Sequence, residues 1–177
     1  MNIKITKSIL PANSLAKNYL PADYVDVFST VVAENKRLTP DNMMIAFWTD
    51  FPQWVQVLFQ LRDWLVKPFG LKTNENEKDF KQKFEVAIRN SGQYNLMTVP
   101  AKSADETVMR LTDKHLTAEL SVCNEKLNDN QLRISIITFV HFHNALGKVY
   151  FFVIRPFHKI IVKAIAKRNV KRLFIKS

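Results

Sequence analysis

Three of the chain's four histidines, His141, His143 and His158, lie close together near the C-terminal end of the sequence. Side chains alternate along a strand, so His141 and His143 would point to the same face if a strand extends that far. Two imidazoles at this spacing can bind zinc or iron when a third ligand lies nearby. The candidates for that third ligand are His115, Asp113 and His158.

A structural role explains the same histidines without a metal. Asn144 is a favourable N-cap for a helix that starts at Ala145, with His143 beside it and His141 packed at the sheet edge. The sequence has no HExxH motif and no carboxylate next to the histidine pair to complete a ligand set. We therefore predict a strand-to-helix joint here and no bound metal.

Three side chains could serve as a general acid or base if they reach a cavity, namely His158, His143 and Asp113. An imidazole titrates near neutral pH, which suits this chemistry. Arg155 could hold an anionic ligand group with its planar guanidinium. The structural alternative is that Arg155 and His158 bond to the sheet or to Asp63, and that Asp113 stabilises a turn before His115.

Several classes of site are excluded by composition. The chain has three glycines and neither GxGxxG nor GxxxxGK[ST], so we predict no nucleotide cofactor of those types and no other cofactor. Cys123 is the only cysteine, which excludes an intrachain disulfide and a cysteine-rich zinc site and favours the reducing cytoplasm. No signal peptide is recognisable at the start, and charged residues interrupt the longest apolar stretch, so we predict no transmembrane helix.

Charge is distributed unevenly along the 177 residues. The formal net charge is +10, and no acidic residue follows Asp129. A basic C-terminal segment of this kind favours an anionic membrane surface, and no nucleic-acid-reading motif accompanies it, so we expect no specific nucleic acid partner. The alternative is a solvated helix face. The residues predicted to face a membrane are Lys159, Lys163, Lys167, Arg168, Lys171 and Arg172.

The N-terminal half predicts one strand followed by two short helices. Val25–Val32 is rich in β-branched residues and predicts a strand. Thr39 as N-cap and Pro40 at the first position predict a helix through Trp48. A second helix is indicated by apolar residues at helical spacing, which are Trp54, Leu58, Leu61 and Leu65.

The remainder predicts a run of strands and then a long helix. A helix from Ala145 to about Lys171 would bury one apolar stripe, formed by Leu146, Val149, Tyr150, Val153, Phe157, Ile160, Ile161 and Ala164. The strands predicted before it are Phe84–Arg89, Tyr94–Pro100, Thr107–Thr112, Leu116–Cys123 and Gln131–His143.

This order predicts a single α+β domain over residues 1–177, with an ordered core at about 19–171, in which a curved antiparallel sheet grips the long helix. Such a helix-grip fold often leaves a cavity between helix and sheet, the usual place for a ligand. The residues we expect to contact a ligand are Trp54, Leu58, Phe139, Tyr150, Val153, Arg155 and Phe157.

Four blocks together resemble a bacterial family known only as a domain of unknown function, number two-eight-six-seven. They are "ADYVDVF" (22–28), "WVQVLFQLRDWLVKPFGLKT" (54–73), "DKHLTAELSV" (113–122) and "VHFHNALGKVYFFVIRPFHKIIVKAIAKR" (140–168). The family is grouped with the START-like, Bet v 1-like SRPBCC superfamily, so the resemblance implies a helix-grip fold and a hydrophobic pocket. It implies no activity, because the family has none assigned.

The sequence leaves two kinds of function open. The first is a carrier that binds an apolar or lipid-like small molecule in the pocket, and the second is a cyclase- or isomerase-type enzyme that uses the same pocket. Members of the family also accompany dehydrogenase-like nucleotide-binding domains, so a redox role here would require a separate dehydrogenase-like partner.

Overall fold

The computed structural model describes residues 3–58 and 79–175 of the chain. Within these ranges the strands form one antiparallel sheet in the order β1-β2-β7-β6-β5-β4-β3. The strands are β1 (Thr6–Lys7), β2 (Tyr24–Ala33), β3 (Gln93–Tyr94), β4 (Met97–Lys102), β5 (Glu106–Thr112), β6 (Leu116–Asn128) and β7 (Gln131–Phe142).

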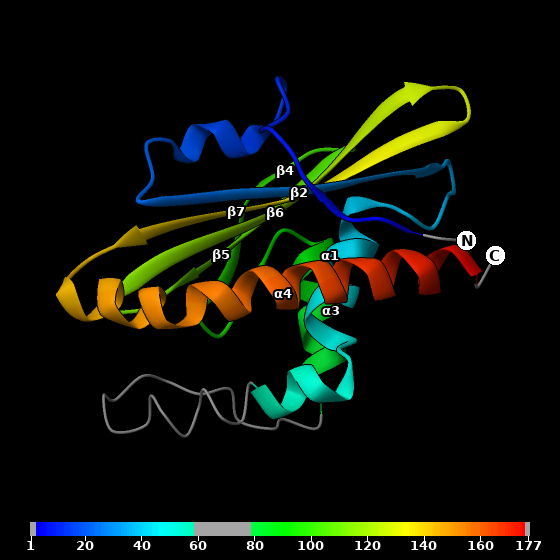
Figure 1. Ribbon diagram of the computed structural model, residues 1–177. Helices are drawn as coiled ribbons and strands as arrows, with labels where there is room; N and C mark the ends of the chain where they lie inside the picture. Colours follow the sequence, from blue (N-terminus) through cyan, green and yellow to red (C-terminus); the bar gives the residue numbers. More distant parts are fainter. Residues whose placement is uncertain (1–2, 59–78, 176–177) are drawn as a thin grey trace.

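Helices lie on both faces of the sheet (Figure 1). The long helix α4 (Ala145–Ile175) crosses one face, where α1 (Pro40–Thr49) and α3 (Phe80–Arg89) also pack, and residues 53–58 are helical as well. The short 3-10 helix η1 (Leu15–Tyr19) lies on the opposite face. This is the predicted helix-grip arrangement, so the expected α+β class is confirmed.

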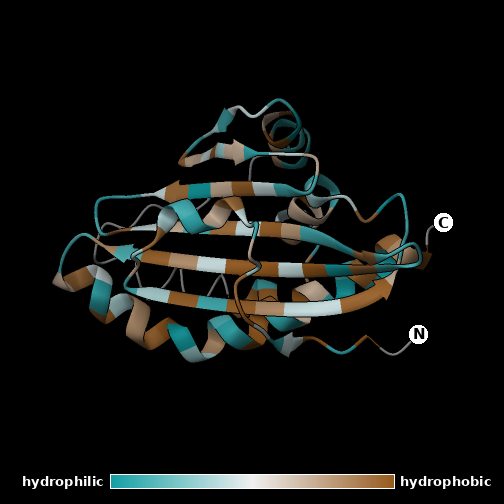
Figure 2. Ribbon diagram, turned by 90° about the horizontal axis from the view of Figure 1, so that it is seen from above, coloured by the Kyte–Doolittle hydropathy of each residue, from teal (hydrophilic) through white to brown (hydrophobic). Residues whose placement is uncertain are grey.

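The strand register separates the side chains into two sets. Thr138 on β7 pairs with Asp26 on β2 and with Leu120 on β6, so these three lie on the face toward α4, which we call the inner face. Glu119 pairs with Phe139, and both belong to the outer face, toward η1. Figure 2 shows hydrophobic and polar residues alternating along the strands, as expected for a sheet with two different faces.

The largest hydrophobic cluster lies between the inner face, α1, α3 and the C-terminal half of α4. Burial of this apolar surface is the main favourable contribution to folding. The helix α4 contributes four residues to it, each at most 1 % exposed: Val162, Ile165, Ala166 and Val170.

The outer face is closed by the N-terminal segment through one buried carboxylate. Glu106 on β5 is 2 % exposed. It accepts hydrogen bonds from the hydroxyls of Ser14 and Ser121 and from the backbone N–H groups of Leu15 and Ala16. Charge-assisted hydrogen bonds of this kind offset the cost of burying the carboxylate and hold η1 on the sheet.

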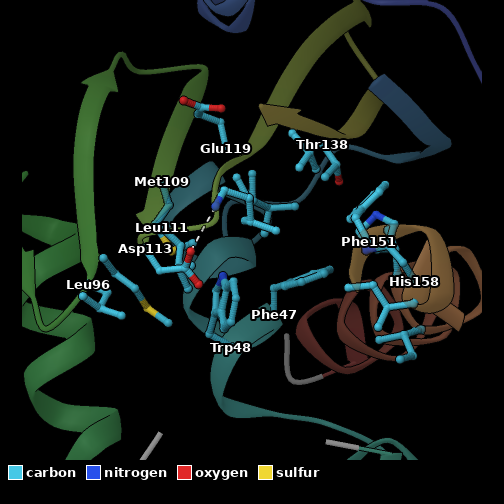
Figure 3. A pocket seen from close by; sticks show the side chains of 18 of the residues that line it. Phe47, Trp48, Leu96, Met109, Leu111, Asp113, Glu119, Thr138, Phe151 and His158 are labelled. Atoms are coloured by element: carbon cyan, nitrogen blue, oxygen red, sulfur yellow. Dashed lines mark hydrogen bonds between the residues drawn. The ribbon is translucent and has the colours of Figure 1, made fainter. Parts of the chain in front are cut away.

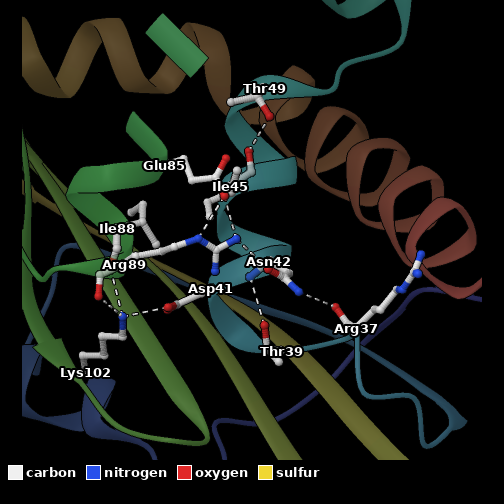
Figure 4. A network of polar contacts seen from close by, with 10 residues as sticks. All are labelled: Arg37, Thr39, Asp41, Asn42, Ile45, Thr49, Glu85, Ile88, Arg89 and Lys102. Atoms are coloured by element: carbon white, nitrogen blue, oxygen red, sulfur yellow. Dashed lines mark hydrogen bonds and ion pairs between the residues drawn. The ribbon is translucent and has the colours of Figure 1, made fainter. Parts of the chain in front are cut away.

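A second polar network fixes α1 and α3 against the sheet (Figure 4). Lys102 Nζ donates to Asp41 Oδ2 at 2.7 Å and to the carbonyl oxygens of Ile88 and Arg89 at 3.0 and 2.9 Å. Thr107 Oγ1 donates to the other oxygen of Asp41 at 2.7 Å. The network joins the first turn of α1 to the last turn of α3 and to β4 and β5.

The start of α4 is fixed by a cap and by a close backbone contact. The Asn144 side chain accepts a hydrogen bond from the Gly147 N–H at 3.1 Å, so Asn144 is the predicted N-cap. The backbone N–H of His143 donates to the His115 carbonyl at 2.9 Å. Gly147 lies against the same carbonyl, and a Cβ added there would be 2.2 Å from the His115 oxygen.

One predicted strand is wrong. Residues 84–89 form the C-terminal part of α3, with Phe84, Ala87 and Ile88 buried at helical spacing. The helix begins at Phe80, and its first residues are mostly polar. The six residues that we predicted as a strand cover less than two helical turns, which is too short to show a helical period. The predicted strand Tyr94–Pro100 is divided between β3 and β4, and β6 is five residues longer than predicted. The other predicted strands and the helices at Pro40 and Ala145 agree to within a few residues, whereas most of the second predicted helix lies outside the described ranges.

The buried face of α4 also differs from the predicted stripe. Val149, Val153, Phe157 and Ile160 are 50–62 % exposed, whereas the buried residues include Phe151, Val162, Ile165, Ala166 and Val170. Apolar residues occur around most of this helix, so the periodicity alone was compatible with more than one rotation about its axis. Of the residues discussed above, Leu61, Asp63 and Leu65 lie outside the described ranges.

Replacing Gly147 by alanine should destabilise the fold. Alanine normally stabilises a helix by about 1 kcal/mol relative to glycine. Here its Cβ would overlap the His115 carbonyl, so we expect a net loss of about 1–3 kcal/mol in the free energy of unfolding, measured with urea. Gly92→Ala is the matched control, because its Cβ would be 3.7 Å from the nearest atoms. A Gly147→Ala variant as stable as the wild type would contradict the close contact.

Candidate ligand-binding cavity

A cavity of about 320 Å³ lies between α4, α1 and the inner face of the sheet (Figure 3). Most of its wall is apolar, with contributions from the five strands β3 to β7, from α1 and α4, and from Leu58. Its lining residues include Phe47 and Trp48 of α1, Met97, Met109 and Leu111 of β4 and β5, Leu116, Ala118 and Leu120 of β6, Thr138 and Val140 of β7, and Tyr150, Phe151, Ile154, His158 and Ile161 of α4.

The cavity forms because α4 packs closely on the sheet at two separated places. Its C-terminal half belongs to the main hydrophobic cluster. Near its start, Phe151 is buried with Leu116 and Val140 in a smaller cluster. Between these places, Ile154 and His158 line the cavity, and His158 also reaches Asp26 of β2.

A polar cluster forms one end of the cavity wall. Asp26 of β2 is 4 % exposed, and its Oδ2 accepts a hydrogen bond from the Tyr24 hydroxyl at 2.6 Å. His158 Nε2 lies 3.4 Å from the same oxygen. Thr138 is the cross-strand neighbour of Asp26, and the described residues provide no hydrogen-bond partner for its Oγ1 or for Asp26 Oδ1.

The environment of Tyr24 changes its acidity. Burial, together with the hydrogen bond to the Asp26 carboxylate, raises the pKa of Tyr24 well above its usual value near 10. The Arg155 guanidinium stacks over the Tyr24 ring at 5.2 Å from its centroid and opposes this shift in pKa. Tyr24 is therefore a hydrogen-bond donor to Asp26 over the whole physiological range.

The opposite end of the cavity has two further polar groups. Trp48 Nε1 is buried, and no acceptor for it is found among the described residues. Asp113 also lines the cavity, but its Oδ1 accepts hydrogen bonds from the backbone N–H groups of His115 and Leu116 at 2.6 and 3.0 Å. Asp113 thus has the turn role that the sequence favoured.

Two ionisable groups near this region belong to the outer face. The Glu119 carboxylate points away from the cavity (Figure 3), accepts a hydrogen bond from Arg110 Nε at 2.9 Å and lies 3.5 Å from His141 Nε2. Cys123 is buried on the same face, where burial and the nearby Glu106 carboxylate raise the pKa of its thiol to about 12. Cys123 is therefore not a reactive thiolate at neutral pH.

The structure places some of the predicted ligand-contact residues in the cavity wall and others outside it. Leu58, Tyr150, Val153 and Phe157 line the cavity. Trp54 is 44 % exposed, and the Arg155 guanidinium lies outside the cavity wall, over Tyr24. Phe139 is fully buried on the outer face, where it packs beneath η1, because the inner position beside it on β7 is Val140.

The three acid–base candidates are also separated. His158 and Asp113 line the cavity, whereas His143 is exposed and lies 3.0 Å from Thr117 Oγ1 through its Nε2. His141 lies near Glu119 at the outer face. In residues 3–58 and 79–175, no three His, Cys, Asp or Glu side chains come close enough together to hold a metal ion.

The basic residues of α4 lie along its solvent side, and some have partners. Arg168 and Arg172 form ion pairs with Asp50 at the end of α1. Lys163 Nζ lies 5.0 Å from the centroid of the Phe28 ring. Lys167 and Lys171 are exposed, and Lys159 is half-buried.

Sequence reasoning missed the polar cluster at Asp26. The signal was present, because Asp26, Phe28, Thr30 and Val32 occupy alternate positions of the predicted strand and so share one face. An aspartate on such a partly apolar face requires a buried partner or a function. Its partners are Tyr24, on the same strand, and His158, which is 132 positions away in the sequence.

The fold and the cavity together define a helix-grip protein with a pocket between its long helix and its sheet. The sequence matches the family described as "Protein of unknown function (DUF2867)" over residues 19–165, and the chain belongs to this family. Comparisons with curated proteins and with solved structures gave no match. Among the described residues, no helix is long and apolar enough to cross a membrane.

Tyr24 should be the last tyrosine to ionise when pH is raised. Its pKa is higher in the folded than in the unfolded state, so its contribution to stability is complete below about pH 10 and is lost at higher pH. Absorbance of tyrosinate against pH should show a late transition that disappears in Tyr24→Phe and moves to lower pH in Asp26→Asn. Tyr150→Phe is the control that should keep it. A late transition that persists in Tyr24→Phe would show that Tyr24 is not its source.

Proposed function

We propose that this protein binds an apolar or lipid-like small molecule in the cavity between α4 and the inner face of the sheet. The observation that carries the proposal is the cavity itself, about 320 Å³ in volume and lined mainly by aliphatic and aromatic side chains. Small-molecule sites in proteins are typically apolar cavities of about 300–1,000 Å³ with a few polar groups that fix orientation. The wall has this composition, with polar groups confined to Asp113, Thr138, His158 and a few neighbours.

An enzyme that uses the same cavity is the second candidate. The observation that favours it is the pair formed by Asp26 and His158, whose closest atoms are 3.4 Å apart. His158 Nε2 is close to this carboxylate but has no hydrogen-bond partner among the described residues, so it can bond to a ligand in the cavity. His158 would then be the general base or acid of a cyclase- or isomerase-type reaction, and Asp26 would orient it.

An anionic membrane surface is the third candidate, and the exposed side of α4 favours it. Val149, Phe152, Val153, Phe157 and Ile160 are spaced to form one stripe, which we call the outer stripe, and each is 50–75 % exposed. The basic residues Lys148, Arg155 and Lys159 follow one another along its flank. An apolar face beside a basic row is the pattern of helices that lie at a bilayer surface. Val153 and Phe157 also line the cavity, so a ligand could pass between membrane and pocket at this place.

Filling the cavity should abolish ligand binding. Ala118 lies on the inner face of β6 and lines the cavity, so Ala118→Phe would occupy the space between Leu111 and Val140, its neighbours across the strands. We expect at least a tenfold loss of affinity for the uncharged apolar dye Nile red, measured by fluorescence titration. Thr117→Phe, the adjacent residue on the outer face, is the matched control and should bind the dye as the wild type does. Equal binding by the wild type and Ala118→Phe would place the dye elsewhere.

Membrane association should depend on both the outer stripe and salt. Phe152 is 75 % exposed, and Phe152→Asp should reduce co-sedimentation with vesicles that contain anionic lipid by several-fold. Val31→Asp, at an exposed position on β2 far from α4, should bind like the wild type. Raising the salt concentration should weaken the association, because it screens the charges. A wild-type protein that does not sediment with anionic vesicles at low salt would exclude this surface as a membrane site.

A further inference from the structure

Two neutral hydrogen-bonding groups in the cavity wall are buried without a partner among the described residues, in addition to the ionisable atoms His158 Nε2 and Glu119 Oε2, which also have none. The two neutral groups are the indole N–H of Trp48 on α1 and the hydroxyl of Thr138 on β7. Figure 3 shows both side chains directed toward the cavity from opposite walls. Buried polar groups in folded proteins are almost always hydrogen-bonded, because leaving one unsatisfied costs free energy. A ligand in the cavity is therefore the natural partner for both, and it must carry a hydrogen-bonding atom.

The ionisable groups around the cavity indicate the charge of that ligand. Although the chain has a net charge of +10, no lysine or arginine is found among the described residues that line the cavity. Asp113 lines it, and Asp26 lies directly behind Thr138 in the adjacent strand. His158 Nε2 lies 3.4 Å from the Asp26 carboxylate, and the Arg155 guanidinium lies over the Tyr24 ring and does not line the cavity. An anionic ligand group would be desolvated beside two carboxylates, with no lysine or arginine in the described wall to pair with it.

We propose that the cavity selects an uncharged oxygen-bearing hydrophobe, of the alcohol or ketone class, over a fatty acid. A ligand oxygen accepts a hydrogen bond from the Trp48 N–H, and a ligand hydroxyl or carbonyl pairs with the Thr138 hydroxyl, which can donate or accept. The apolar remainder of the ligand fills the space between Met109, Leu120 and Ile154. This inference rests on the proposed function and adds to it the chemical class of the ligand.

The experiment compares three probes of equal chain length, namely decanol, decanone and decanoate, as competitors of bound Nile red. The pH is kept well above the pKa of a carboxylic acid, so that decanoate is fully ionised. We expect decanol and decanone to displace the dye at concentrations at least tenfold lower than decanoate does. Decanoate that displaces the dye as effectively as decanol would overturn the inference while leaving the proposed function intact. If neither the dye nor any of the three probes binds, the proposed function itself fails.

Two variants test the assigned groups separately. Thr138→Val keeps the shape of the side chain and removes its hydroxyl, and Trp48→Phe keeps an aromatic ring and removes the N–H. Each should weaken decanol binding roughly fivefold, the effect of one hydrogen bond, when the competition is corrected for the variant's own affinity for Nile red. Thr117→Val on the outer face is the control, and it should leave decanol binding unchanged. If both variants bind decanol as tightly as the wild type, the two groups do not contact the ligand and the inference is wrong.

Discussion

The structure depends on how a helix of 31 residues is held across a twisted sheet. A straight helix cannot follow such a sheet closely along its whole length, so close packing is confined to parts of it. In this protein the C-terminal half of α4 packs in the main core, and Gly147 brings its N-terminal end against the His115 carbonyl. Between these attachments the side chains of α4 leave space beside the sheet, and His158 reaches the sheet there, at Asp26. The cavity is therefore a consequence of these two attachments, and its floor is completed by α1, which the Asp41–Lys102 network fixes to β4 and β5.

The buried polar residues of the sheet differ in how fully their polar atoms are hydrogen-bonded. Glu106 on the outer face is surrounded by hydroxyl and backbone donors, and its role is to hold η1 in place. Asp26 and Thr138 on the inner face have polar atoms for which the described residues provide no partner. Apolar residues of similar size would pack at these positions at a lower cost in desolvation. Groups that stability alone does not explain are the expected places for function, which is why both proposals center on this part of the wall.

Much of the architecture could be predicted from sequence because its signals are local. The alternation in β6, the cap at Asn144 and the length of the C-terminal helix each follow from neighbouring residues. The sequence does not predict which side of α4 is buried. Apolar residues surround this helix, and only packing against the sheet selects the buried side. Phe139 could not be assigned to a face of the sheet either. A shift of one residue in the register of β7 exchanges its inner and outer positions. The pairing of Asp26 with His158 joins segments distant in sequence, so it required the fold.

The most direct test is a high-resolution crystal structure of the protein purified from its own host. The account predicts continuous density in the cavity between α4 and the inner face, with a ligand atom within hydrogen-bonding distance of Thr138 Oγ1 or Trp48 Nε1. It would be contradicted by a closed core in which α4 lies against the sheet along its full length and both groups find partners within the protein.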